Sequence, residues 1–411
     1  MLTRASARSH LLALTAALGL CALAPCPAQA CGGMLFESHA ERLGGMNAQE
    51  LFLSLTPEES VLVLSASFVD ASGDKAFLLP LRAAPTEVRD ADEGLFIALE
   101  TGTVPIVTID TLSSPSGGIA CGALDGGAGG RGPDGGDIEV LERGMTASYD
   151  YVVVGGETGT GLSEWLDGEG FSVPADVAGA LDTYIEGGWY FLAAKLAPER
   201  AEGRVAPLEL RLPAMHPTAT IPFGLASMSL GPSDELDILL YISSPQTILP
   251  RNYDVEVIAG LVEARGSSES NYAELYDEIV GGAPRWVLES SQEWEPSVLT
   301  RWAWGLLEYE LNVDAEYDEA WLEDFSARLG YASGRLSRLR TRLGKDELVD
   351  LQLDAAQDMD VEREIYVSWD PDGVAERGGC STDEGSLAGL ALLGVLGFVR
   401  RRRVPASRRG S

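Results

Sequence analysis

The residue types that most often carry enzymatic chemistry are few in this chain and show no recognised spacing. Beyond the first 30 residues the histidines are His39 and His216, far apart in sequence, and His216 stands in a turn beside Pro217. The spacings H-E-x-x-H and C-x-x-C, typical of zinc ligands, are absent, and so is the G-x-S-x-G turn of serine hydrolases. The sequence therefore predicts no catalytic residue, no cofactor and no metal ligand.

Carboxylates are the one abundant reactive group, with 63 Asp and Glu against 30 Lys and Arg and a formal net charge of −33. Paired carboxylates can hydrolyse glycosides, so a hydrolase of this type, with or without a divalent cation, stays open as an alternative. A body so acidic repels nucleic-acid phosphates, which excludes nucleic acid as a partner. Because 45% of the residues are hydrophobic, the charge is better interpreted as the solvated surface of a folded protein than as a disordered acidic chain.

The N-terminus has the pattern of an export signal. Arg4 and Arg8 precede an apolar run over 11–24, and Ala28 and Ala30 form a small-x-small cleavage site before Cys31. We therefore predict that residues 1–30 are a signal peptide and favour ordinary cleavage, with lipidation of Cys31 as the open alternative.

Export places the remaining cysteines in an oxidising compartment. After removal of the signal peptide, Cys31 and Cys121 are the only cysteines before the C-terminal tail. A disulfide between them is the simplest expectation, because exported proteins keep such bonds.

The clearest succession of elements lies in residues 138–196. β-Branched and aromatic residues predict strands over 149–154 and 189–196, and apolar residues at helical spacing predict two short helices between them. Gly187 and Gly188 end the second helix, since glycine readily takes the backbone conformation of a helix C-terminus.

The other segments divide the chain into regions. We predict an N-terminal β-meander (31–112), a glycine-rich loop (113–137), a central α+β region (138–297), a C-terminal helical region (298–358) and a linker (359–379). The fold class is therefore α+β, a β-rich body with short inserted helices and a more helical C-terminal part. Within 298–358, the basic cluster Arg335 to Lys345 is expected to pair with carboxylates, and an anion site there is the alternative.

The central block resembles a known family. Its order of YDYVVV, a WL turn, a G-F-x-V-P step and WYFLAAKL, together with CGG at Cys31 and the step Leu79-Pro80, is similar to the bacterial domain of unknown function DUF2330 over residues 31 to about 355. The resemblance implies no established activity and no catalytic residues.

The C-terminal segment 380–411 has three parts in a fixed order. Cys380 is followed by a short polar spacer, by 13 apolar residues over 387–399, and by Arg400, Arg401, Arg402 and Arg403. This order resembles the MYXO-CTERM sorting tail, which implies a sorting protease and the envelope membrane as partners and Cys380 as the anchoring residue. By itself the apolar run is shorter than the ~20 residues that span a bilayer.

These features together predict an exported protein that is anchored at the cell envelope or outer surface through its C-terminal region. Its expected role is that of a non-enzymatic binding or structural module for an unknown envelope ligand. The alternative is the carboxylate hydrolase described above.

Overall fold

The structure is a computed structural model of the 411-residue chain. It describes residues 33–36, 45–69, 75–92, 94–111, 138–169, 177–196, 207–230, 233–308, 319–327 and 330–369. The predicted signal peptide, the glycine-rich loop and the sorting tail lie outside these ranges.

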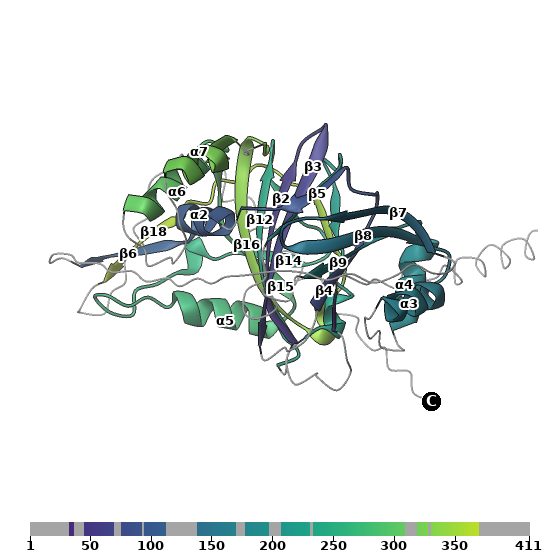
Figure 1. Cartoon of the computed structure of the whole chain (residues 1–411). Coiled ribbons are helices and arrows are strands. Elements are labelled where there is room, and N and C mark those ends of the chain that lie inside the picture. The colour runs from purple at the N-terminus through teal and green to yellow at the C-terminus, as the bar shows by residue number, and fades with distance from the viewer. Residues whose placement is uncertain are drawn as a thin grey trace, which may run out of the picture.

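A mixed eight-stranded sheet forms the centre of the molecule (Figure 1). Its strands, in spatial order, are β14 (Asp254–Val257), β15 (Arg285–Trp294), β16 (Gly334–Gly344), β12 (Glu235–Ser244), β2 (Gly45–Leu55), β3 (Glu59–Val69), β10 (Leu208–Pro213) and β5 (Glu87–Asp90). β12 runs parallel to β2, and β14 runs parallel to β15. All other neighbours in this sheet are antiparallel.

Alternating side chains give this sheet two buried faces. In β2, Leu51 and Leu53 contribute to the largest core cluster, whereas Phe52 belongs to a second cluster on the opposite face. In β12, Leu240 and Tyr241 divide in the same way. Because side chains of a strand alternate between faces, both faces of this sheet must be covered by other elements.

A five-stranded antiparallel sheet shares the largest core with one face of the central sheet. Its order is β1 (Gly33–Phe36), β4 (Lys75–Leu81), β9 (Tyr190–Leu196), β8 (Tyr149–Gly156) and β7 (Ile138–Met145). Helices α3 (Gly159–Gly168) and α4 (Val177–Glu186) pack on this sheet through Leu162 and Leu181. Thr158 caps α3, since its Oγ1 accepts a hydrogen bond from the Gly161 amide at 3.0 Å.

A small sheet completes the largest core. It consists of β11 (Ala219–Ile221), β17 (Leu351–Ala355) and β13 (Ile248–Pro250), which are paired antiparallel. The short 3-10 helices are η4 (Ala226–Met228), η5 (Ala259–Leu261) and η6 (Lys345–Glu347).

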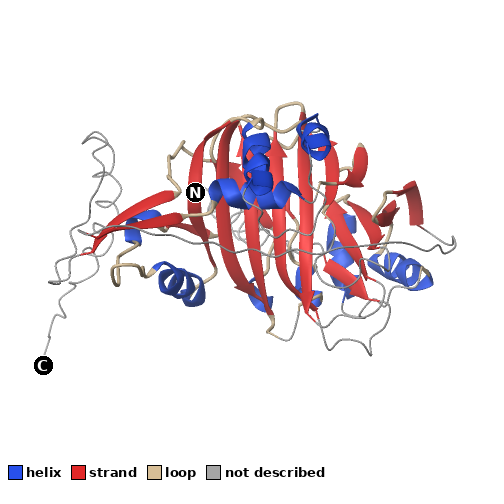
Figure 2. Ribbon diagram, turned by 60° about the vertical axis from the view of Figure 1, so that its left-hand side comes forward, coloured by secondary structure: helices blue, strands red, loops and turns tan. Residues whose placement is uncertain are grey.

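Helices cover the other face of the central sheet, as Figure 2 shows. They are α2 (Gly94–Thr103), α6 (Val298–Glu308) and α7 (Glu319–Ala327), and Leu95, Leu299 and Phe325 fill the core beneath them. Farther along this face, α5 (Tyr272–Gly282) packs on Val287 and on a parallel ribbon of β6 (Ile106–Thr111) and β18 (Glu364–Trp369). No helix in the described ranges is long and apolar enough to cross a membrane.

The β-rich α+β class with short helices is confirmed, but several details differ from the sequence prediction. β2 and β3 are adjacent, whereas β4 joins the five-stranded sheet, so the region 31–112 is not a single meander. β9 and β12 likewise belong to different sheets. Strand pairing between distant segments depends on contacts that local patterns do not contain.

The C-terminal regions are also divided differently. Helices α6 and α7 occupy the first half of the predicted helical region 298–358, but β16 and β17 occupy its second half. The predicted linker 359–379 contains β18, which pairs with β6, so residues 364–369 are strand and not linker.

Candidate functional site

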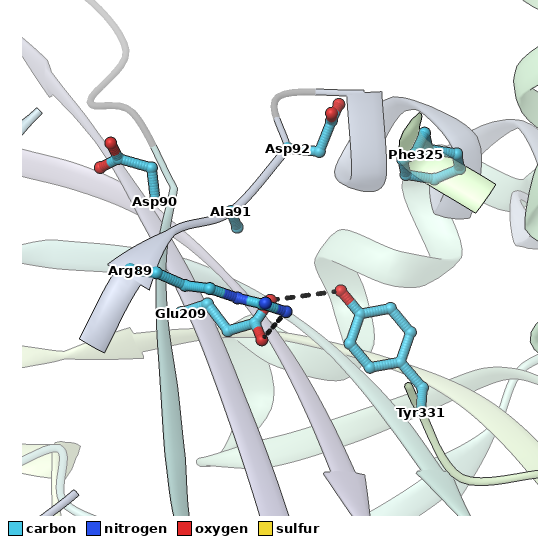
Figure 3. A pocket seen from close by; sticks show the side chains of 7 residues that line it. All are labelled: Arg89, Asp90, Ala91, Asp92, Glu209, Phe325 and Tyr331. Atoms are coloured by element: carbon cyan, nitrogen blue, oxygen red, sulfur yellow. Dashed lines mark hydrogen bonds and ion pairs between the residues drawn. The ribbon is translucent and has the colours of Figure 1, made fainter. Parts of the chain in front are cut away.

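A small polar pocket lies where β5 and β10 meet α7 (Figure 3). It contains about 250 Å³ of empty space, including its opening to solvent. Its lining consists of Arg89, Asp90, Ala91, Asp92, Glu209, Phe325 and Tyr331. Its lining includes three carboxylates and an arginine, which are groups that acid–base chemistry could use.

Glu209 is the buried centre of this pocket, with only 2% of its surface exposed. Arg89 Nη2 donates to Glu209 Oε1 at 2.5 Å, and the Nε of Arg211 lies 3.4 Å from the same oxygen. Tyr331 adds a long hydrogen bond of 3.5 Å to Oε2, as the dashed lines in Figure 3 show. The oxygens of Glu209 are therefore already occupied by protein donors.

The charge of Glu209 contributes to the pKa shifts of two of its neighbours. Burial opposes the charge on Arg89, but the neighbouring Glu209 outweighs it and raises the pKa of the guanidinium. Burial raises the pKa of Tyr331 most strongly, and the charge of Glu209 raises it further. Both groups therefore stay protonated at neutral pH and act as donors to Glu209.

The two aspartates of the pocket are also engaged. Both carboxylate oxygens of Asp92 lie 3.1 Å from the indole Nε1 of Trp321, and its Oδ1 also accepts from the Gly94 amide. Asp90 accepts a hydrogen bond of 2.7 Å from the Thr146 hydroxyl. These bonds link β5 to α7, to the start of α2 and to the turn before β8, so the pocket's polar groups serve to hold elements together.

A second buried polar network surrounds Arg338 on β16. Its Nε donates to Glu289 Oε2 at 2.6 Å, and its Nη1 contacts Glu100 and the Tyr241 hydroxyl. Tyr272 donates to the other oxygen of Glu289 at 2.5 Å. Burial opposes the charge of Arg338, but its anionic and phenolic neighbours outweigh that effect and raise its pKa.

Asp350 is a buried carboxylate of a different kind. It is 6% exposed, and the Tyr184 hydroxyl donates to its Oδ1 at 2.9 Å. Burial raises the pKa of Asp350 to about 6, although the Tyr184 hydrogen bond and the charge of Arg82 oppose the shift. Asp350 lies before β17 and Tyr184 lies in α4, so this contact links the small sheet to the helix that packs on the five-stranded sheet.

The residues predicted from sequence fall into two groups. Cys31, Cys121, Cys380, the signal-cleavage alanines Ala28 and Ala30, and the arginines Arg400 to Arg403 lie outside the described residues. Within the described ranges, no group of three or more His, Cys, Asp or Glu side chains is placed to hold a metal ion.

The basic cluster, in contrast, is fully described. It forms β16, where Arg335 pairs with Asp360 at 2.6 Å, and Arg342 pairs with Asp237 and Asp277 at 3.3 and 3.0 Å. Together with the Arg338 network, these contacts agree with the expected pairing to carboxylates.

The ion pairs of Glu209 with Arg89 and Arg211 were not predicted from the sequence. A signal was present, because LELRLP in β10 places Glu209 and Arg211 on the face opposite Leu208, Leu210 and Leu212. By itself this alternation is typical of a strand with one solvated face, so the burial of Glu209 depends on the elements that cover β10 and not on the pattern.

Comparison with known proteins defines the class of this chain. The family model described as an uncharacterized protein conserved in bacteria (DUF2330) matches residues 25–331. The chain belongs to this family. No curated protein matches it.

Some solved structures show a distant likeness. Two of them are crystal structures of a mutated baculovirus P35 after caspase cleavage, and each aligns over 75% of this chain with a TM-score of 0.31. Their sequence identities to this chain are 10% and 11%, and the alignments cover 99% and 98% of their own chains, respectively. The crystal structure of the caspase-8/P35 complex aligns over 76% of this chain and 94% of that chain, at 8% identity and a TM-score of 0.28. At such TM-scores the likeness carries no argument about fold or function.

Proposed function

We propose that this member of the DUF2330 family is an exported, surface-anchored protein that acts as a non-enzymatic binding or structural module of the cell envelope. The observation that carries the non-enzymatic part is the state of its buried glutamates. Glu209 and Glu289 are 2% and 1% exposed, and each is bound by arginine and by a tyrosine hydroxyl. Groups held in this way stabilise the contacts between strands and helices, and their oxygens are already occupied by protein donors.

Sequence features support the location. The signal peptide over 1–30 would direct export, with cleavage after Ala30, and the tail from Cys380 would be cut by a sorting protease. Arg400 to Arg403 would remain on the cytoplasmic side of the membrane during sorting, which leaves the acidic body outside. A disulfide between Cys31 and Cys121 would be stable in that compartment.

One observation favours the alternative of a carboxylate hydrolase. A buried carboxyl with a pKa raised to about 6, such as Asp350, has the property that general acids and bases need near neutral pH. However, the Tyr184 hydroxyl already donates to Asp350, and Asp350 belongs neither to the ion pairs around Glu209 nor to the network around Arg338. Hydrolysis would need a second carboxylate beside it.

Surface labelling and envelope pull-down test this proposal together. We expect a membrane-impermeant amine reagent to label the protein on intact cells, and crosslinked envelope material to be recovered with the purified full chain. A protein that stays unlabelled until the cells are lysed would contradict the surface location. Turnover of envelope glycans that disappears in Asp350→Asn would instead favour the hydrolase.

A further inference from the structure

Arg340 differs from the other arginines of β16. Arg338, Arg340 and Arg342 alternate along the strand and face the helix layer, and the first and last of them pair with carboxylates. Arg340 is half-buried, and its guanidinium lies over the ring of Tyr276, whose centroid is 4.2 Å from its Cζ. Among the described carboxylates, none forms an ion pair with it.

Tyr276, on α5, has an unsatisfied hydroxyl at the same place. The residue is 3% exposed, and no described group forms a hydrogen bond with its hydroxyl. Burial raises the pKa of Tyr276, while the charges of Arg340 and Arg342 oppose that shift. A buried hydroxyl without a partner costs free energy, so such a group in a native protein calls for an explanation.

A further buried donor without a hydrogen-bond partner lies on the neighbouring strand β15. The Nε of Arg285 is buried without a hydrogen-bond partner. Arg285 begins β15 directly beside β16, where its carbonyl accepts from the Thr341 hydroxyl at 2.7 Å. The Nη atoms of Arg285 lie 3.9 Å from Asp254 and 3.5 Å from Glu256, so its charge is already paired. Arg340 has no carboxylate partner and the Tyr276 hydroxyl has no hydrogen-bond partner among the described residues, so an acceptor beside this pair would satisfy both groups.

We propose that Arg340 and Tyr276 form the binding position for an oxyanion, either a carboxylate or a phosphate group of an envelope ligand. The Arg340 guanidinium stacks on the Tyr276 ring, and the hydroxyl is attached to the edge of that same ring. The guanidinium and the hydroxyl are therefore close neighbours. An oxyanion at this edge can accept from both groups at once, and arginine suits both kinds of anion. Because the hydroxyl is buried, binding requires a small outward movement of α5 or of the Arg340 side chain.

This inference deepens the proposed role as a binding module by naming the chemistry of its ligand, and it rests on that role for its biological meaning. The two can fail separately. An exported and anchored chain that binds no oxyanion would refute only the inference, and an oxyanion-binding chain that stays in the cytoplasm would refute only the proposed function.

The test is calorimetric titration of the full chain, purified in detergent, with inorganic phosphate and with acetate, each compared with chloride at equal ionic strength. We expect saturable binding of at least one of the two anions. Tyr276→Phe, which keeps the ring and removes the hydroxyl, and Arg340→Gln should each weaken binding by about tenfold, as the loss of one charge-assisted hydrogen bond implies. Arg251→Gln is the control, because this arginine is 63% exposed and pairs with Asp354 of β17 in the small sheet.

The outcomes separate the sources of the anion. Tighter binding of phosphate indicates a phosphorylated ligand, whereas comparable binding of acetate indicates a carboxylate. Wild-type binding no stronger than that of chloride would overturn the proposal. So would unchanged affinity in Tyr276→Phe, a variant that retains the packing of α5 and therefore the fold.

Discussion

Arg338 binds Glu289 through its Nε at 2.6 Å, and the two side chains are only 5% and 1% exposed. The pair joins β16 to β15, and Glu100 of α2 and Tyr272 of α5 complete its hydrogen bonds. The network thus ties two helices to the central sheet through charged groups. Removing either charge of such a pair costs more than the pair itself contributes, because the other charge stays buried.

We therefore predict that Arg338→Met lowers the free energy of unfolding by about 3 to 5 kcal/mol. Arg342→Met is the control, because its side chain is 33% exposed and its aspartate partners are 39% and 63% exposed. Such surface pairs contribute about 0 to 1 kcal/mol. Urea unfolding of the two variants measures the difference, and equal losses would show that the Arg338 network is not the stabilising element inferred here.

Asp350 should make stability depend on pH in the opposite direction from an ion-paired carboxylate. Its pKa is about 6 in the folded protein, against 3.8 for an unperturbed aspartate. Above pH 6 the charged, buried carboxylate therefore destabilises the fold. As the pH falls through 6, the folded state takes up the proton first and this penalty disappears.

Asp350→Asn should accordingly raise the free energy of unfolding at pH 7.5 by about 1 to 3 kcal/mol, with little effect near pH 4. The asparagine oxygen can still accept from Tyr184. Asp354→Asn, on the neighbouring strand β17 with a side chain 41% exposed, is the control and should change stability by about 0.5 kcal/mol or less. A destabilised Asp350→Asn protein at pH 7.5 would mean that Asp350 is stabilised as an anion.

Gly102 allows α2 to approach α6. A Cβ built at this position would lie 2.1 Å from an atom of the Trp302 ring on α6. A methyl group therefore cannot fit unless the Trp302 ring or α6 moves. We predict that Gly102→Ala lowers the free energy of unfolding by about 1 to 3 kcal/mol.

Gly179 in α4 offers the matched comparison. Nothing lies within 4 Å of a Cβ built there, and the residue is exposed. Gly179→Ala should therefore raise stability by up to about 1 kcal/mol through helix propensity. Thermal melting should show a lower melting temperature for Gly102→Ala and a higher one for Gly179→Ala. An unchanged melting temperature for Gly102→Ala would show that the Trp302 ring or α6 can move away from α2.

Local patterns predicted local elements well in this chain. β8, α3, α4 and β9 follow one another where strand residues, helical spacing and glycine stops predicted them, because these signals act within a few residues. The assignment of β4 and β9 to a separate sheet could not be predicted, since both faces of each strand are apolar and give no register with a particular partner.

The candidate site illustrates the same limit. The basic cluster of β16 was recognisable as a group that needs carboxylates. Its partners Glu100 and Glu289 lie 238 and 49 residues away from Arg338, and no pattern in the sequence identifies them among 63 acidic residues. The LELRLP alternation of β10 can be recognised in the sequence. It does not identify Arg89, on the neighbouring strand β5, as the ion-pair partner of Glu209.

The predicted disulfide can be tested by thiol alkylation. Closing a loop of about 90 residues between Cys31 and Cys121 should stabilise the protein by about 4 kcal/mol. Neither cysteine should react with iodoacetamide in the denatured, unreduced protein, whereas both should react after reduction. Cys121→Ser should free the thiol of Cys31; reaction of both cysteines without reduction would contradict the bridge, and a diacyl mass on Cys31 would favour lipidation.

The intact mass and location of a Cys380→Ala variant test the central claim of export and anchoring most directly. Wild-type protein from the cell surface should begin at Cys31, end close to Cys380 and lack Arg400 to Arg403, with a mass added at Cys380 by its anchor. The variant should keep its full tail and remain in the inner membrane. If Cys380→Ala protein instead reaches the cell surface with its arginines removed, Cys380 has no part in sorting and the account of anchoring is wrong.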